Sequence, residues 1–232
     1  MEHRWDVTPQ EAKRIQTELR ERLVTEPPPG FAPRLAGGAD VSFRRFSRRG
    51  YAGVVVLDVE SLLPVAQAAV AADLVFPYVP GYLSFRELPP IAAAWARLER
   101  RPDVLVFDGQ GTAHPRRFGV ACHGGLLFDV PSVGCAKSLL VGTHGPLGEE
   151  RGSTAPIVHQ GETVGMAVRT RTGVKPVYVS PGHRMDLDTA VEVVLRLARR
   201  FREPETTRHS HRLVNELRRG SPGEAGDGNP SP

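Results

Sequence analysis

Apolar residues recur every three or four positions in several stretches of this chain, which is the spacing of helices that bury one face. The first such stretch follows Thr8, which forms a capping box with Glu11, while Pro9 suits the first helical turn. Asp186 is the expected N-cap of a later amphipathic helix. Three further helices are expected to begin at Glu87, Pro115 and Thr206.

Short apolar runs between these stretches predict strands. Three runs, at residues 35–43, 53–58 and 64–75, are separated by turns and suggest an antiparallel meander. A continuous apolar run at 104–107 is typical of a strand covered on both faces. Later strands are expected at 130–133, 158–168 and 175–179. The sequence therefore predicts an α/β fold in one domain over residues 1–219, followed by a disordered tail at 220–232.

Two aspartates stand at strand positions where a carboxylate is unusual. Asp108 follows the 104–107 run, at the carboxyl end of a buried strand, and Asp40 lies inside the first strand. Asp108 could instead belong to a simple Asp-Gly turn, and Asp40 could face water on an edge strand. Two neighbouring carboxylates repel each other unless a cation lies between them, and oxygen ligands favour Mg²⁺ or Mn²⁺.

Lys137 and Glu87 add charges of both signs to this set. Lys137 comes just after the 130–133 strand, where its ammonium group could stabilise developing negative charge. Glu87 opens a predicted helix, and a favourable interaction with the helix dipole would by itself explain an acid there. A hard cation held by carboxylates beside basic residues suits phosphodiester hydrolysis, although carboxylate pairs also occur in glycosidases and kinases.

Residues 76–87 combine aromatic residues with two prolines and a glycine, which argues against a regular element. We expect a rigid loop that presents Tyr78, whose ring could wedge into a base stack; the alternative is a ring that fills the core. A helix beginning at Pro115 would point its first amide groups at the Asp108 loop, ready for a phosphate. Arg116 and Arg117 are either a phosphate contact or part of a solvated face.

Composition narrows the class of protein without selecting one. The chain has 232 residues, of which 40% are hydrophobic, so it can bury a sizeable core. The formal net charge of +4 permits a polyanionic partner without requiring one. Two cysteines imply no disulfide framework, and no CxxC or HExxH pattern points to zinc. Without an apolar signal or a run of the ~20 residues that span a membrane, the expected location is the cytoplasm.

Several motifs, in the right order, resemble those of the endonuclease V family. The motifs are PYVPGYLSFRE at 77–87, DGQGTAHPRRFG at 108–119, GADVS at 38–42, GCAK at 134–137 and GHR at 182–184. The resemblance extends over residues 8–217. It implies a ribonuclease H-like fold, in which a mixed sheet is flanked by helices on both faces.

The resemblance also implies roles for individual residues. Asp40 and Asp108 would bind the metal ion, Glu87 would complete the acidic site and Lys137 would be the site lysine. His211 falls where the family carries His or Asp in the last helix, with His209 as a nearby rival. The residues expected to contact the substrate are Tyr78 as the wedge, the pocket residues Gly81, Leu83, Gly109, Gly111, Gly119 and Val120, and also His114 and Arg116.

Three positions depart from the family pattern, and one of them, Cys135, stands at a usually aliphatic position and should matter little. Gln110 stands where many members have His, which leaves the role of that side chain in strand contact open. Ser138 replaces a second lysine often found after Lys137, which would weaken a phosphate contact.

The activity implied by the resemblance is a metal-dependent DNA repair endonuclease that recognises deoxyinosine, the product of adenine deamination. It would nick the second phosphodiester bond 3′ to the lesion and leave 3′-hydroxyl and 5′-phosphate ends, with Mg²⁺ as cofactor and Mn²⁺ as a substitute. The expected partner is DNA that contains deoxyinosine, bound by a monomer. Two alternatives stay open: an inosine-specific ribonuclease, and a non-catalytic nucleic-acid-binding module on the same fold.

Overall fold

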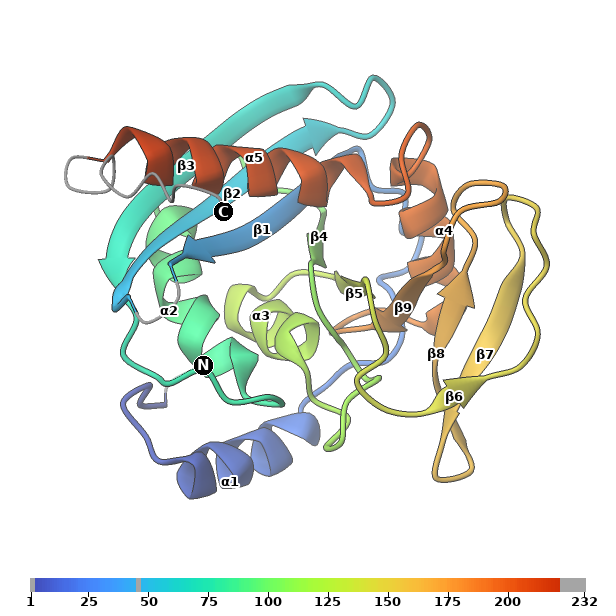
Figure 1. Ribbon diagram of the computed structural model, residues 1–232, viewed down its shortest axis with the longest axis horizontal. Helices are drawn as coiled ribbons and strands as arrows, with labels where there is room; N and C mark the ends of the chain where they lie inside the picture. The colour runs from blue at the N-terminus through green and yellow to red at the C-terminus, as the bar shows by residue number, and fades with distance from the viewer. Residues whose placement is uncertain (1–2, 45–46, 222–232) are drawn as a thin grey trace, which may run out of the picture.

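The computed structural model describes residues 3–44 and 47–221. The strands in this part of the chain form one nine-stranded mixed sheet, in the order β3-β2-β1-β4-β5-β9-β8-β7-β6 (Figure 1). The strands are β1 (Leu35–Phe43), β2 (Arg49–Asp58), β3 (Pro64–Asp73), β4 (Val104–Phe107), β5 (Ser132–Ala136), β6 (Thr143–His144), β7 (Thr154–His159), β8 (Glu162–Val168) and β9 (Val177–Pro181). The helices are α1 (Pro9–Arg20), α2 (Leu83–Trp95), α3 (Val120–Phe128), α4 (Leu187–Leu197) and α5 (Glu205–Gly220).

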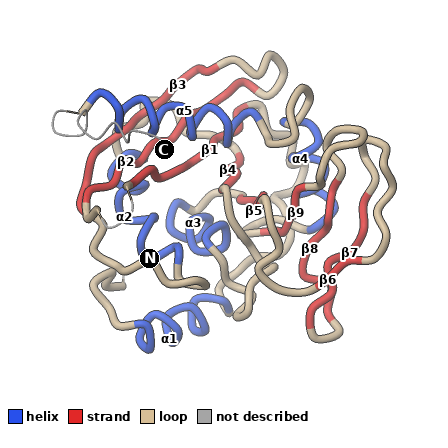
Figure 2. The backbone as a smooth tube through the Cα atoms, in the orientation of Figure 1, coloured by secondary structure: helices blue, strands red, loops and turns tan. Residues whose placement is uncertain are grey.

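The centre of the sheet is parallel, and both flanks are antiparallel. β4 pairs in parallel with β1 on one side and with β5 on the other. β1, β2 and β3 form the predicted antiparallel meander, while β5 continues through β9, β8 and β7 to β6 at the far edge (Figure 2). Because only the central strands run parallel, their carboxyl ends meet at one edge of the sheet, which is where open α/β sheets bind ligands.

Alternating residues of β1 separate the two faces of the sheet. Ala36 packs with side chains of α4, and a Cβ on Gly38 would collide with the backbone of Thr206 in α5, so these two helices cover one face. Ala39 and Val41 pack with side chains of α2 and α3 on the other face. The predicted ribonuclease H-like mixed sheet with helices on both faces is therefore confirmed.

Several local predictions are confirmed as well. The capping box of Thr8 and Glu11 is present at the start of α1, and the Asp186 side chain caps α4. β1 and β4 have the predicted bounds, and all four residues of β4 are buried between the two layers of helices. Cys122 and Cys135 are free and buried.

The predicted starts of two helices were wrong. α2 begins at Leu83, so Glu87 lies inside the helix and residues 83–87 are not part of the loop. The burial of Phe85 and Leu88 against the core outweighs the hydrogen bonds that the internal prolines remove. α3 begins at Val120, and Pro115 lies in the turns before it.

The predicted strand at 158–168 is two strands, β7 and β8, which form an antiparallel hairpin. Gln160 and Gly161 between them have φ of 57° and 80°, as a tight hairpin turn requires. β5 and β9 both begin later along the chain than predicted. The predicted tail lies outside the described residues from position 222 onward. Among the helices of the described part, none combines the length and the hydropathy of a membrane span.

Candidate active site

The parallel pairing of β1 with β4 brings Asp40 and Asp108 to neighbouring positions. The register pairs Ala39 with Phe107, and the next residue in each strand is the aspartate. Burial raises the pKa of Asp40, and the charge of Asp108 raises it further, against the opposing effect of a hydrogen bond from His211. Because β1 lies inside the sheet, the alternative of Asp40 on a water-facing edge strand is excluded.

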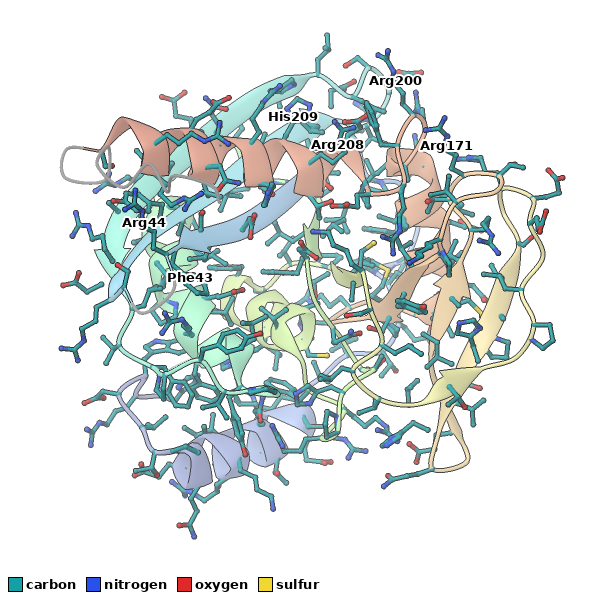
Figure 3. All side chains as sticks on the ribbon, in the orientation of Figure 1. Phe43, Arg44, Arg171, Arg200, Arg208 and His209 are labelled. Atoms are coloured by element: carbon teal, nitrogen blue, oxygen red, sulfur yellow. The ribbon has the colours of Figure 1, made fainter. Side chains whose placement is uncertain are left out.

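His211 reaches Asp40 from α5, which lies across β1 and β2 (Figure 1). The His211 Nδ1 atom is 2.8 Å from Asp40 Oδ2, while Asp40 Oδ1 accepts the Val41 N–H at 2.7 Å. His209 comes from the same helix (Figure 3), but its Nδ1 accepts a hydrogen bond from Arg212 Nη2 at 3.0 Å. The structure therefore places His211, and not its rival His209, beside the acidic pair.

Lys137 lies one residue beyond β5 and bridges two carboxylates. Its Nζ donates to Asp108 Oδ2 at 2.6 Å and lies 3.2 Å from Glu203 Oε2. Burial alone would lower the pKa of Lys137, but the hydrogen bond to Asp108 and the charges of both carboxylates raise it above its usual value. Arg202 donates to the Lys137 carbonyl at 3.0 Å and holds the backbone of this residue. The ammonium group is thus kept protonated and fixed in place.

Glu87 adds a third carboxylate from α2, on the opposite face of the sheet from α5. Burial raises the pKa of Glu87 well above its usual value, and the charges of Asp40 and Asp108 raise it further. The three carboxylates are therefore close enough to repel one another, and a divalent cation would relieve this repulsion.

The chemistry of this donor set fits a hard divalent cation, since carboxylate oxygens are the ligands that Mg²⁺ prefers. In the described part of the chain, no three His, Cys, Asp or Glu side chains are grouped as a ready-made metal site. Asp40 and Asp108 would be the protein ligands, and water or substrate phosphate oxygens would supply the rest. A site with one or two carboxylates and several exchangeable ligands is typical of Mg²⁺.

A cavity of about 350 Å³ opens beside the acidic pair, and both Asp108 and Lys137 form part of its wall. Seven predicted substrate-binding residues line it: Tyr78, Gly81, Leu83, Gly109, His114, Gly119 and Val120. Side chains that the sequence did not single out for this wall also line it, among them Gln16, Ser84, Gln110, Leu139 and Leu140. The volume is in the range of pockets that hold a small organic ligand such as a purine base.

Gly111 and Arg116 lie beside the cavity and do not line it. A Cβ on Gly111 would lie 2.0 Å from the Pro181 carbonyl oxygen, so this glycine is required by the packing of the backbone. Arg116 instead donates from Nη2 to the Gly81 carbonyl at 2.6 Å. Its effect on the cavity is therefore exerted through Gly81.

His114 also fixes Gly81. Its Nε2 is 2.9 Å from the Gly81 carbonyl oxygen, and its Nδ1 accepts the Arg116 N–H at 3.2 Å. Burial, followed by the charge of Arg116, lowers the pKa of His114 to about 4. The ring is therefore neutral at pH 7, with its proton on Nε2.

The loop after Asp108 is tied down on two sides. The first turn of α3 donates to it, from the Ala121 N–H to the Gln110 carbonyl at 3.1 Å, so this amide is not free for the phosphate that the sequence suggested. The Gln110 Nε2 donates to the Ser138 carbonyl at 3.0 Å. Two of the three positions that depart from the family pattern, Gln110 and Ser138, thus contact each other at the wall of the cavity.

Tyr78 and Arg117 settle two alternatives. The Tyr78 side chain is 65% exposed at the rim of the cavity, so it does not fill the core. Arg117 is buried and pairs with Glu162 at 2.9 Å and with His159 at 3.0 Å, which fastens the β7–β8 hairpin. Arg117 is therefore neither a phosphate contact nor part of a solvated face.

Glu203 and Gln16 are among the polar residues of the site that sequence reasoning missed. Nothing in the sequence distinguishes Glu203 from other acids near a helix start. Gln16 does leave a signal, because it interrupts the apolar face of α1 between Ile15 and Leu19 and is itself 1% exposed. A polar residue on the buried face of a helix needs hydrogen-bond partners. The partners of Gln16 are Gly81 in the cavity wall and two residues next to that wall, Phe118 and Arg116.

The fold and the site define a ribonuclease H-like α/β protein with one aspartate inside a central strand and a second directly after the neighbouring strand. The chain belongs to the endonuclease V family, whose family model matches residues 17–212, and it is an endonuclease.

Similar proteins agree with this assignment. The endonuclease V of Myxococcus xanthus is 69% identical over 97% of this chain and 95% of its own length. The crystal structure of endonuclease V from Streptomyces avermitilis superposes with a TM-score of 0.87 at 43% identity, covering 92% of this chain and 94% of its own. A Ciona intestinalis endonuclease V variant in complex with a 23-mer DNA containing an inosine followed by a ribo-adenosine has a TM-score of 0.79 at 26% identity, with 91% and 98% coverage.

Proposed function

We propose that this protein is a divalent-cation-dependent endonuclease that recognises deoxyinosine in DNA. It nicks the second phosphodiester bond 3′ to the lesion and leaves 3′-hydroxyl and 5′-phosphate ends. The main support is the adjacency of two features: an aspartate pair at neighbouring positions, in β1 and directly after β4, and a purine-sized cavity whose wall includes one of those aspartates.

Asp40 and Asp108 hold Mg²⁺, or Mn²⁺ in its place, and Glu87 adds negative charge beside them. The bound cation would polarise the phosphoryl oxygen and help to deprotonate the attacking water. His211 fixes the Asp40 carboxylate through their 2.8 Å contact, which restricts the direction in which that carboxylate can coordinate. Lys137 carries a fixed positive charge beside Asp108 and stabilises negative charge that develops on the phosphate.

Recognition takes place in the cavity, after the base has been turned out of the duplex. Tyr78 is exposed at the rim, so its ring can occupy the gap that the everted base leaves. The backbone of Gly81, Gly109 and Gly119 can approach the base closely, because these wall residues have no side chains. Hypoxanthine is read by backbone amides and carbonyls, with Leu83 and Val120 as apolar contacts.

The test is cleavage of an end-labelled DNA duplex with a single deoxyinosine in the presence of Mg²⁺. We expect one nick at the second phosphodiester bond on the 3′ side of the deoxyinosine. We expect no nick in the matched duplex with deoxyadenosine. An uncut inosine duplex, or a cut at another bond, would refute the proposal. Cleavage of the corresponding RNA strand with inosine is measured alongside. Preferential cutting of RNA would select the ribonuclease alternative.

A further inference from the structure

The Gln16 side chain, on α1, forms hydrogen bonds with two separate segments of the chain at the cavity. Gln16 is 1% exposed and lies on the buried face of the helix. Its Nε2 donates to the Gly81 carbonyl at 3.1 Å and to the Phe118 carbonyl at 3.2 Å, while its Oε1 accepts the Arg116 Nε–H at 2.6 Å. The polar atoms of this amide are therefore all paired, and each partner belongs to the cavity wall or directly supports it.

The two carbonyl groups come from different segments of the chain. Gly81 ends the loop that carries Tyr78 and has φ of +81°, a conformation that residues other than glycine rarely adopt. Phe118 precedes Gly119, which lines another part of the cavity wall. The amide of Gln16 thus spans from the loop of the proposed wedge to the wall that the everted base would face.

The Gly81 carbonyl accepts hydrogen bonds from three side chains. Besides Gln16, the donors are His114 Nε2 at 2.9 Å and Arg116 Nη2 at 2.6 Å. His114 and Arg116 come from the same segment, just before α3, whereas Gln16 comes from α1. Gln16 also donates to the Phe118 carbonyl, so it links the position of the loop to that of the wall segment at Gly119.

Packing of α1 alone would not require an amide at this position. The neighbouring buried residues of the same face are apolar: Ala12, Ile15 and Leu19. An amide buried among them lowers stability unless its hydrogen bonds are complete. The amide at this position is therefore required by the groups to which Gln16 is hydrogen-bonded, and not by the packing of α1.

We infer that Gln16 is a positioning residue for base selectivity. It sets the separation between the Tyr78 loop and the wall at Gly119, so that the cavity accepts the everted hypoxanthine and discriminates against adenine. This inference rests on the proposed function. Gln16 has no contact with Asp40 or Asp108, so the dependence of cleavage on Mg²⁺ concentration should not involve it.

Two variants test this role. Gln16→Leu removes all three hydrogen bonds, whereas Gln16→Glu keeps the acceptor for Arg116 and loses both donors to the carbonyls. Each variant is compared with the wild-type protein for kcat/KM on inosine and adenine duplexes. We expect both to lose selectivity for inosine by about tenfold or more, mainly through KM, with an unchanged half-saturating Mg²⁺ concentration. Wild-type selectivity in Gln16→Glu would overturn the inference, and this variant decides the matter if Gln16→Leu does not fold.

Leu19→Ala is the matched control, since Leu19 is buried on the same face of α1 and packs in the same apolar cluster as Ile15. It should lower the melting temperature without changing the ratio of kcat/KM values. An equal loss of selectivity in Leu19→Ala would attribute the effect to helix docking and refute the role of Gln16. If the wild-type protein itself does not prefer inosine, the proposed function fails; if it does and the Gln16 variants keep that preference, only this inference fails.

Discussion

Tyr78 is 65% exposed at the rim of the cavity, although an aromatic ring usually buries its large apolar area. The residues around it explain how the ring is held out of the core. Pro77 and Pro80 stiffen the loop, and the Gly81 carbonyl is fixed by side chains of three residues. An exposed ring on an anchored loop can enter a base stack without a large loss of conformational entropy.

Replacement of Tyr78 by Ala should reduce lesion discrimination more than the rate of cleavage at saturation. The acidic pair is untouched, while the gap left by an everted base would no longer be filled. Discrimination is measured as the ratio of kcat/KM for inosine and adenine duplexes, and we expect it to fall by about tenfold or more. Val75→Ala is the control, because Val75 is equally exposed, at 65%, but does not line the cavity. An unchanged ratio in Tyr78→Ala would argue against the wedge.

At the scale of elements, the position of α5 against β1 depends on the absence of a side chain at Gly38. A Cβ at that position would lie 2.2 Å from the carbonyl oxygen of Thr206, in the first turn of α5. The same helix carries His211, whose Nδ1 is 2.8 Å from Asp40. Close contact between helix and strand is therefore part of the geometry of the site.

Gly38→Ala should force α5 away from the sheet and lower the free energy of unfolding by about 1–3 kcal/mol, as overpacking of a core does. Cleavage should fall with it, because His211 moves relative to Asp40. Urea denaturation gives the stability. Gly145→Ala provides the comparison, because a Cβ there would have no atom within 4 Å. The free energy of unfolding of this variant should stay within about 0.5 kcal/mol of the wild-type value. Equal stability of the two variants would contradict this description of the interface.

The elements that sequence patterns predicted well are those in which local preference and tertiary packing agree. β4 is apolar throughout because both its faces are covered, and α1 and α4 begin at side chains that cap them. The start of α2 at Leu83 could not be predicted, because the prolines at 89 and 90 are tolerated in the first turn of a helix that begins at Glu87 but remove hydrogen bonds from one that begins earlier. The burial of Phe85 and Leu88 nevertheless stabilises the longer helix.

The residues of the candidate site likewise fall into those that the sequence could place and those that it could not. Asp40 and Asp108 could be placed together from the sequence, since each stands at a distinctive point of a strand that the pattern defines. Glu203 and Gln16 could not, because their contacts with Lys137 and Gly81 join segments that are far apart in the chain. Sequence patterns are informative about periodic elements, whereas contacts between loops depend on how those elements pack.

At the scale of the whole molecule, the N-terminal segment is linked to the cavity through the half-buried His3 and the buried His123. His3 Nε2 is 2.8 Å from His123 Nε2, and His123 Nδ1 is 2.9 Å from the hydroxyl of Ser84, a cavity residue. Trp5 stacks on the His123 ring at 5.1 Å between ring centroids. Burial lowers the pKa of His123 well below 6.5, and the nearby His3 lowers it further.

This burial predicts a loss of stability in acid. Below pH 6.5 the unfolded chain binds a proton at His123 that the folded protein does not bind, so the free energy of unfolding falls as the pH falls. Each such histidine contributes a slope of about 1.4 kcal/mol per pH unit until its folded-state pKa is reached. Urea denaturation between pH 7 and pH 5 should show this slope reduced in His123→Asn, which removes the ring and keeps a polar partner for Ser84. Parallel curves for the two proteins would show that His123 is not responsible.

Cleavage of a single-deoxyinosine duplex across a Mg²⁺ titration tests most directly whether Asp40 and Asp108 share a catalytic cation. The wild-type protein should cut in a Mg²⁺-dependent manner and stop in EDTA while remaining folded. Asp40→Ala and Asp108→Ala should each lose cleavage by about a hundredfold or more and still bind the duplex, whereas Asp188→Asn, at an exposed position on α4, should behave as wild type. Cleavage in EDTA, or undiminished cleavage by either Ala variant, would contradict the assignment of this metal site.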